Sequence, residues 1–202
     1  CNCPYDAILH LNIDNKHVAS ITINDGIKDN AKEVIKKLKK DNIKVHLLTG
    51  DKKDVALSIG KKLGIDDIKY EMLPTDKYKM YEEIDQNALS IFVGDGVNDA
   101  PVLKRADIGI SMGNVGSEVA IEASDIVIMN DDLNKIPQAI NISKYTKKII
   151  KQNLIFAFLT KIIILLLSVF GLATMYLAVF ADTGVTLITI INTLRIKNKF
   201  EK

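Results

Sequence analysis

Three oxygen-bearing side chains gather in one short stretch of the sequence. Residues 94–101 read Gly-Asp-Gly-Val-Asn-Asp-Ala-Pro, which places Asp95, Asn98 and Asp99 close together along the chain. Mg²⁺ prefers a few carboxylates with waters and phosphate oxygens, and the glycines beside Asp95 allow backbone and cation to approach closely. Asp95 is therefore the expected Mg²⁺ ligand, and Asn98 and Asp99 are expected to orient the site from behind it. By composition alone, the same stretch is an ordinary Asp/Gly turn.

Two further positions carry groups suited to a phosphoryl oxygen. Thr49-Gly50-Asp51 follows an apolar run and offers a hydroxyl and a backbone N–H. Lys77, just after a Pro-Thr-Asp sequence, would place a positive charge beside a transferring phosphoryl group. Each signal is weak alone, because many strand-to-helix turns resemble the first and most lysines lie on the surface. The three elements in this order are more specific than any one of them.

The first part of the sequence predicts the scaffold that positions these groups. Strands are expected at 17–24, 43–48, 68–72, 89–93, 108–112 and 125–129, and helices at 31–40, 55–63, 76–84 and about 117–123. This alternation predicts a parallel, doubly wound α/β sheet of the Rossmann-like type. Functional groups collect at the carboxyl ends of strands in such sheets. Both Thr49–Asp51 and Asp95–Asp99 follow predicted strands directly.

Charge nearly vanishes between Leu154 and Leu194, where Lys161 and Asp182 are the only charged residues. Apolar runs at 154–170 and 178–194 are each close to the lower limit of a membrane span, about 17 residues, and flanking residues make both long enough. The sequence therefore predicts a transmembrane hairpin. The alternative is a soluble hydrophobic hairpin, which two runs this apolar would leave with too little polar surface.

Basic residues flank both apolar runs, and the turn between them at 171–177 carries no charge. The positive-inside rule then places both ends of the hairpin in the cytoplasm and the turn outside. The flanking residues are Lys144, Lys147, Lys148 and Lys151 before the first run, and Arg195, Lys197, Lys199 and Lys202 after the second. We accordingly expect a soluble domain at 1–143 and a membrane hairpin with basic flanks at 144–202.

Composition excludes several other classes of protein. The formal net charge is +2, the lysines are dispersed among acidic residues and aromatics make up 6% of the chain, which argues against nucleic-acid binding. Cys1 and Cys3 are the only cysteines, too few for a disulfide framework. The pair could contribute to a soft-metal site but does not complete a tetrahedral one, so we interpret it as incidental. The opening residues lack a signal-peptide pattern.

The motifs Thr-Gly-Asp, Pro-Thr-Asp-Lys and Gly-Asp-Gly-Val-Asn-Asp-Ala-Pro, in this order, resemble the second half of the phosphorylation domain of P-type ATPases. That domain is a haloacid-dehalogenase-like fold, and the resemblance covers essentially the whole chain, including residues 106–129 after the last motif. It implies that Thr49 holds the phosphoryl group, Lys77 neutralises it and Asp95 binds the catalytic Mg²⁺. Asn98 and Asp99 would complete the site.

One departure from the family pattern decides the expected activity. The phosphorylated aspartate of the family, in an Asp-Lys-Thr-Gly-Thr motif, does not occur in this sequence, and neither do the nucleotide-binding and actuator domains. We therefore expect a C-terminal part of a pump that is inactive alone and works with the remaining pump domains. One alternative is a membrane-anchored phosphatase, but neither Asp14 nor Asp25 lies in the Asp-x-Asp pattern it needs. Another is a non-catalytic remnant or regulatory partner.

Lys161 and Asp182 point to the transported ion. Charges inside a membrane cost roughly 2.5–3.5 kcal/mol each on insertion scales, so each is a functional candidate, although they could also form a structural ion pair or Lys161 could reach the interface. A lysine in the first helix and Asp182-Thr183-Gly184 in the second resemble the zinc-, cadmium- and lead-exporting branch of the family. Met175-Tyr176 is a mild departure from it.

That branch implies a multi-pass pump in the cell membrane, which uses Mg²⁺ and ATP, the latter through domains absent here. Zn²⁺, Cd²⁺ or Pb²⁺ would be the cargo, Asp182 its ligand and Lys161 a built-in counter-ion. Copper pumps are expected to carry Asn, Tyr, Met and Ser ligands in these helices instead.

Overall fold

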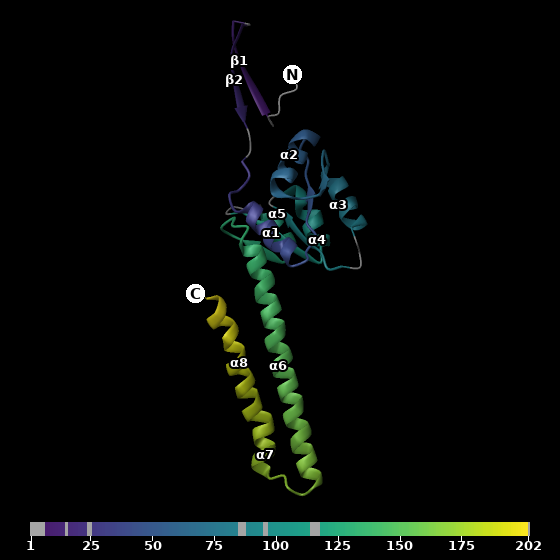
Figure 1. Ribbon diagram of the computed structural model, residues 1–202, viewed down its shortest axis with the longest axis vertical. Helices are drawn as coiled ribbons and strands as arrows, with labels where there is room; N and C mark the ends of the chain where they lie inside the picture. Colours follow the sequence, from purple (N-terminus) through teal and green to yellow (C-terminus); the bar gives the residue numbers. More distant parts are fainter. Residues whose placement is uncertain are drawn as a thin grey trace. The chain divides into compact units, whose positions relative to one another are not determined.

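The computed structural model describes residues 7–14, 16–23, 26–84, 88–94, 97–113 and 118–201. Contacts divide the chain into two compact units, residues 1–135 and 136–202. The first unit contains all of the described strands and the short helices between them, and the second contains the long helices (Figure 1). The division falls where the continuous helix α6 (Lys135–Val169) begins, so the boundary expected at residue 143 from composition lies inside this helix.

Strands and helices alternate through the first unit after an initial hairpin. The elements are β1 (Ala7–Ile13), β2 (Lys16–Ile23), α1 (Ala31–Lys40), β3 (His46–Leu48), α2 (Lys53–Leu63), β4 (Asp67–Lys69), α3 (Pro74–Glu83), β5 (Ile91–Gly94), η1 (Val97–Asp99), α4 (Ala100–Arg105), β6 (Ile108–Met112), α5 (Glu118–Ala123) and β7 (Ile126–Ile128). The predicted α/β alternation is thus confirmed, with boundaries shifted by a few residues. Proline explains one shift, since Pro74 starts α3 at a position where its missing N–H costs nothing.

The antiparallel hairpin of β1 and β2 opens the described chain, and β1 was not predicted. Its alternation of apolar Leu9, Leu11 and Ile13 with polar residues is nevertheless a period-2 strand signal. The pairing is irregular between Leu11 and Asn12. Leu11 pairs with Ala19 while Asn12 pairs with His17, so Val18 is an extra residue on β2, as in a β-bulge.

The parallel strands form two sheets instead of the single sheet that alternation suggested. β3 pairs with β4, and β5, β6 and β7 pair in that order, all in parallel. Within the described residues, one side of β3 and one side of β5 therefore lack a strand partner. The β5 side chains Ile91 and Val93 remain 38% and 37% exposed although the sequence reads as a buried strand. Helices α1 to α5 gather around these strands (Figure 1).

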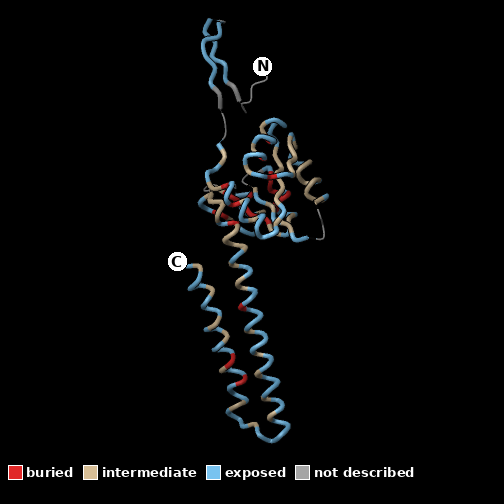
Figure 2. The backbone as a smooth tube through the Cα atoms, in the orientation of Figure 1, coloured by how far each residue is buried: buried red, intermediate tan, exposed pale blue. Residues whose placement is uncertain are grey.

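The core of the first unit lies between α4 and β6. Val102 and Leu103 of α4 are fully buried, and Ile110 and Met112 of β6 are nearly so (Figure 2). Gly109 makes this packing possible, because a Cβ there would lie 2.4 Å from the carbonyl oxygen of Leu103. The helix that follows the Asp95–Asp99 segment is thus fixed tightly against the sheet.

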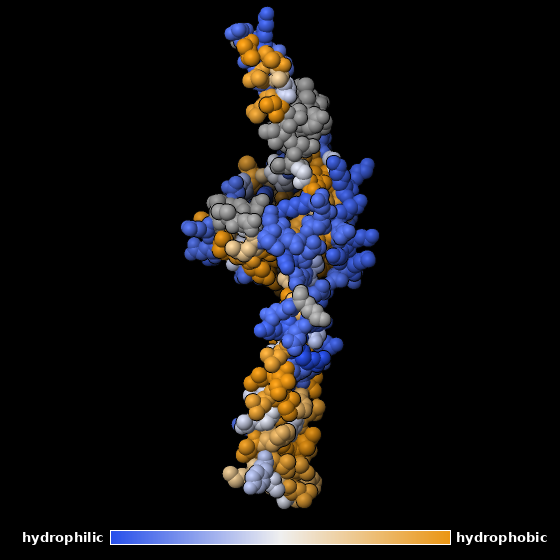
Figure 3. Space-filling model, turned by 90° about the vertical axis from the view of Figure 1, so that its left-hand side faces the viewer, coloured by the Kyte–Doolittle hydropathy of each residue, from blue (hydrophilic) through white to orange (hydrophobic). Residues whose placement is uncertain are grey.

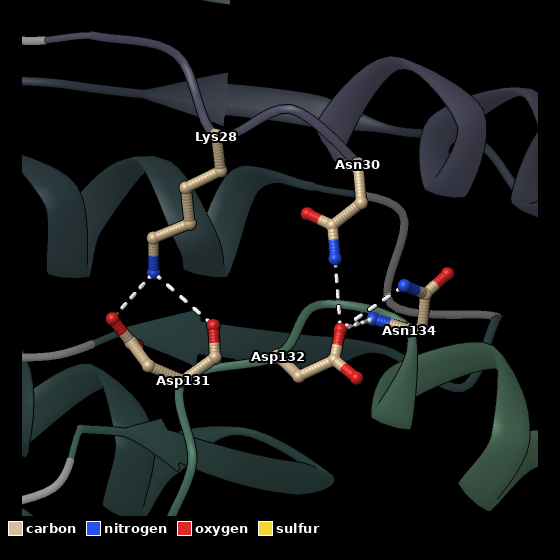
Figure 4. A network of polar contacts seen from close by, with 5 residues as sticks. All are labelled: Lys28, Asn30, Asp131, Asp132 and Asn134. Atoms are coloured by element: carbon tan, nitrogen blue, oxygen red, sulfur yellow. Dashed lines mark hydrogen bonds and ion pairs between the residues drawn. The ribbon is translucent and has the colours of Figure 1, made fainter.

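A polar network joins two distant segments of the first unit (Figure 4). The Lys28 ammonium lies 2.7 Å from Oδ2 of Asp131. Asn30 donates from Nδ2 to Asp132 Oδ1 at 2.8 Å, and the backbone N–H of Asn134 donates to the same oxygen at 3.0 Å. These hydrogen bonds, above all that from Asn134, hold the pKa of Asp132 below its usual value. The network fixes the loop leading into α6 against the segment before α1.

The second unit is a helical hairpin with an apolar surface. It consists of α6, α7 (Met175–Val179), the π-helical turn η2 (Phe180–Gly184) and α8 (Val185–Phe200). Residues 135–169 and 175–200 are each long and apolar enough to cross a membrane. In the most apolar stretch of each helix, 0% and 6% of the residues, respectively, are buried within the structure. Figure 3 shows this hydrophobic surface. Helices that expose so much apolar surface do not resemble the core helices of a soluble domain.

Amide side chains connect the two arms of the hairpin. Asn153 of α6 donates from Nδ2 to the backbone oxygen of Thr189 and to Oγ1 of Thr193, both at 3.1 Å. Asn192 donates in return to Asn153 Oδ1 at 2.7 Å. Hydrogen bonds of this kind stabilise helix pairs in lipid, where hydrophobic burial does not. The sequence prediction considered only the charged residues of the hairpin and missed this contact.

Candidate functional site

The Thr49–Asp51 segment forms a tight turn directly after β3. Thr49 donates from Oγ1 to Asp51 Oδ2 at 2.6 Å, and the backbone N–H of Asp51 donates back to Oγ1 at 3.1 Å. The turn is anchored to the segment after β4, because the Thr49 carbonyl accepts a hydrogen bond from Met72 at 3.1 Å. A Cβ on Gly50 would lie 3.3 Å from the Met72 carbonyl oxygen, so glycine suits this close approach. The hydroxyl and backbone of Thr49 are thus held at a strand end.

Lys77 and Asp99 form an ion pair between α3 and η1. The Lys77 Nζ lies 2.9 Å from Asp99 Oδ1, and the two side chains are only 18% and 12% exposed. The structure therefore brings together two residues that are distant in sequence and that we expected at the phosphoryl site. Because Oδ1 of Asp99 is bound by the ammonium, Asp99 is better placed to orient Lys77 than to bind a cation directly. Asn98, beside it, is exposed to solvent.

Asp95, the expected Mg²⁺ ligand, lies outside the described residues. Its neighbour Gly94 is described and packs closely against Asp99. A Cβ on Gly94 would lie 2.9 Å from both Cβ and Oδ2 of Asp99. Carboxylate oxygens such as those of Asp95 and Asp99 are hard ligands that suit Mg²⁺, but Oδ1 of Asp99 is already bound to Lys77. The assignment of Asp95 and Asp99 to the cation stays a prediction.

Replacing Gly94 with alanine should displace Asp99 from Lys77. The added methyl overlaps the Asp99 side chain, and overpacking of this kind costs about 1–3 kcal/mol. Urea unfolding of the full chain in detergent, followed by circular dichroism, measures the loss. Gly26→Ala is the matched control, because a Cβ at Gly26 meets no atom within 4 Å. Equal effects of the two substitutions would contradict the assigned contact.

Asp182 lies in the π-helical turn η2 of the second unit. Such single turns interrupt the α-helical hydrogen-bond pattern and occur frequently at functional sites. The Asp182 carbonyl accepts a hydrogen bond from Thr186 Oγ1 at 2.7 Å. Gly184 is required in this turn, because a Cβ there would lie 2.5 Å from the ring of Phe180. Gly184, two residues after Asp182, therefore leaves room for the Phe180 ring of the same turn. The sequence analysis did not predict this contact.

Lys161 lies exposed on α6, and no ion pair between Lys161 and Asp182 is present in the structure of the hairpin. Their expected charge neutralisation stays a prediction. Across the described ranges there is also no cluster of three or more His, Cys, Asp or Glu side chains that could hold a metal ion. A transport site built on Asp182 would therefore need ligands from elsewhere.

Comparison with known proteins agrees with these features. The sequence profile of haloacid dehalogenase-like hydrolases matches residues 4–107, and a second profile of the same description matches residues 78–140. The chain is 46% identical over 200 residues to the cadmium, zinc and cobalt-transporting ATPase of Bacillus subtilis, with 95% of the chain aligned. It is 42% identical over 193 residues to the zinc-transporting ATPase of Synechocystis, with 94% aligned.

A solved structure extends the likeness to three dimensions. The crystal structure of a zinc-transporting PIB-type ATPase in an E2.Pi state matches 94% of the chain with a TM-score of 0.84 and 34% sequence identity. The chain spans only 28% and 27% of the two curated relatives and 31% of this structure. It aligns with all three through both the α/β unit and the helical hairpin. The chain thus belongs to the haloacid dehalogenase-like hydrolases, and its resemblance to the heavy-metal P-type ATPases is confirmed.

Proposed function

We propose that this chain is the part of an ATP-driven heavy-metal export pump that contains most of the phosphorylation site and one transport ligand. The observation that carries the proposal is the Lys77–Asp99 ion pair. A lysine held by a partly buried carboxylate, close to the end of β5, is a fixed positive charge suited to a phosphoryl group. The relatives are cadmium- and zinc-transporting ATPases, which supports Zn²⁺ and Cd²⁺ as cargo. We extend the proposal to Pb²⁺ as a third cargo ion and to ATP, which would be bound by the remaining domains of the pump.

The nucleophile of the pump would come from a strand outside these residues. We infer that this strand pairs with the sides of β3 and β5 that have no strand partner among the described residues. A phosphorylated aspartate must lie within hydrogen-bond reach of Thr49, which follows β3, and of Lys77, which contacts the segment after β5. A strand between them satisfies both requirements. It would also cover Ile91 and Val93, whose exposure is unusual for apolar residues of a parallel strand.

The residues of this chain then have distinct tasks in the reaction. The aspartate oxygen attacks the γ-phosphorus of ATP, and the bond from that phosphorus to the ADP oxygen breaks. The Thr49 hydroxyl, which donates to Asp51 in this structure, would turn towards a phosphoryl oxygen. Lys77, held by Asp99, balances the negative charge on the group in transfer. Asp95 would hold Mg²⁺, which would supply further screening of the charge on the phosphoryl oxygens.

A phosphorylation experiment tests the proposal. The chain alone should form no acid-stable phosphoenzyme with ATP, whereas the chain joined to the upstream portion of the Bacillus subtilis relative should form one. Asp95→Ala should lower the phosphoenzyme level of the joined protein at least about 100-fold, since a metal ligand is lost. Phosphorylation of the chain alone on one of its own aspartates would contradict the proposal and favour the membrane-anchored phosphatase.

The apolar hairpin supports a place in the cell membrane, and we propose that both of its ends face the cytoplasm. Basic residues flank both helices and the connecting turn is uncharged. In a background without Cys1 and Cys3, Ala173→Cys should react with an impermeant thiol reagent on intact cells. Lys199→Cys should react only after permeabilisation. Labelling of Lys199→Cys alone on intact cells would reverse the proposed orientation.

A further inference from the structure

Two of the three histidines of the chain lie together on the β1–β2 hairpin. His10 Nδ1 is 3.3 Å from His17 Nε2, and the two rings meet edge to face with centroids 5.3 Å apart. The Ser20 hydroxyl lies 3.0 Å from His10 Nδ1 and 2.8 Å from His17 Nε2. Three polar atoms thus form a small triangle on an exposed surface. The third histidine, His46, is elsewhere and contacts Asp67 at 2.6 Å.

The β-bulge in β2 is what places His17 on this face. His10 pairs with Ser20 across the hairpin, so their side chains share one face. Side chains alternate along a strand, so His17, three residues before Ser20, would point to the opposite face of a regular strand. The extra residue Val18 reverses the alternation, and His17 pairs with Asn12 on the face of His10. Bulges commonly redirect a side chain in this way beside functional sites.

The spacing of the two nitrogens fits a metal ion. Two imidazole nitrogens bound to one tetrahedral Zn²⁺ at 2.0–2.1 Å lie about 3.3 Å from each other. His10 Nδ1 and His17 Nε2 already have this separation, within hydrogen-bond distance of each other, and a metal ion would take the place of the proton between them. Imidazole nitrogens favour borderline transition metals over Mg²⁺ or Ca²⁺. The Ser20 hydroxyl, a weak ligand itself, lies where it can accept a hydrogen bond from a metal-bound water.

We propose that His10 and His17 form a binding site for a divalent transition metal, Zn²⁺ in the first place, on the β1–β2 hairpin. Two protein nitrogens bind the ion, waters fill the remaining positions and Ser20 orients one of them. A site with two protein ligands leaves open positions through which the metal can exchange. The site uses other residues than Asp182 and does not depend on the pump function proposed above.

Equilibrium dialysis of the full chain in detergent against radioactive Zn²⁺ tests the site. The background carries Cys1→Ser, Cys3→Ser and Asp182→Asn, which removes the two thiols and the proposed transport ligand. One Zn²⁺ should bind per chain, and His10→Asn or His17→Asn should each weaken binding about 10–100-fold or more, since each removes a direct ligand. His46→Asn is the matched control and should leave the affinity unchanged. Ser20→Ala should weaken binding less than either histidine substitution.

Imidazole NMR signals provide a readout that does not depend on substituted chains. Zn²⁺ should shift the ring signals of His10 and His17 together, with one saturation curve, and should leave those of His46 unchanged. The proposal is overturned if no saturable binding occurs in the background, or if binding survives both single histidine substitutions. It is also overturned if the His46 signals move with the other two. In each of these cases the two histidines and Ser20 are only a hydrogen-bonded surface cluster.

Discussion

Asp182→Ala should abolish zinc-stimulated ATP hydrolysis in a pump assembled from this chain and the upstream portion of a relative. The expected loss is more than about 100-fold, because Asp182 is the proposed metal ligand. Asp182 is an acidic residue in an exposed apolar helix, where burying an unneeded charge in lipid is costly. It also lies in the π-helical turn η2, and such turns occur frequently at functional sites. Both features support Asp182 as an ion-binding position.

Further substitutions distinguish the effect of the Asp182 charge from the effect of its side-chain size. Asp182→Asn keeps the size of the side chain and should fail as severely as alanine if the negative charge binds the metal. Lys161→Ala should retain zinc binding but slow turnover, because it removes the ammonium that is proposed to neutralise Asp182 after metal release. Lys161→Arg should recover part of the rate. If the Asp182→Ala pump transports zinc at the unmodified rate, the carboxylate is only structural and the zinc assignment loses its main local support.

Lys77→Ala should lower the rate of phosphoenzyme formation about 10²–10³-fold, the usual cost of removing one preorganised charge or donor from a transition state. The same substitution leaves the carboxylate of Asp99, 12% exposed, without its ammonium. An unsatisfied, partly buried charged group costs about 1–3 kcal/mol of folding stability. Rapid-quench phosphorylation measures the first effect and urea unfolding in detergent measures the second.

A double substitution distinguishes catalysis from stability at the same pair. Lys77→Met combined with Asp99→Asn removes both charges, so most of the lost stability should return. The phosphorylation rate should not return, because no cation faces the phosphoryl group. If the double variant regains the rate as well as the stability, Lys77 acts only in folding, and its assignment to the phosphoryl site is wrong.

Sequence patterns predicted which segments form helices and strands better than they predicted which strands pair with each other. The apolar run before Gly94 was correctly predicted as a strand, yet β5 has Ile91 and Val93 exposed, because pairing depends on a neighbour that periodicity does not specify. The β1 strand was missed although its alternation was readable. The extra residue Val18 was not foreseeable, since a bulge depends on register with the opposite strand.

At the candidate site, the sequence likewise predicted the residues but not the contacts between them. Spacing along the chain singled out Thr49 and Lys77, whose neighbours in sequence have recognisable patterns. It did not predict that Lys77 would pair with Asp99, because α3 and η1 are brought together only by the packing of the α/β unit. The π-helical turn at Asp182 was equally hidden. Its hydrogen-bond pattern adds one residue to a turn without changing the apolar composition on which the membrane prediction depended.

In the part of the chain that the structure describes, β3 and β5 each have one side without a strand partner, and this affects protein synthesis. In the proposed pump, the strand that pairs with them would be made earlier than this part of the chain, because translation proceeds from the N-terminus. That strand would already be available for pairing when β3 and then β5 leave the ribosome. Neither β3 nor β5 would then expose unpaired backbone groups to other molecules. A chain translated without that strand would expose both edges at once, as templates for pairing with its own copies. The order of translation would then act as protection against aggregation that the folded unit lacks by itself.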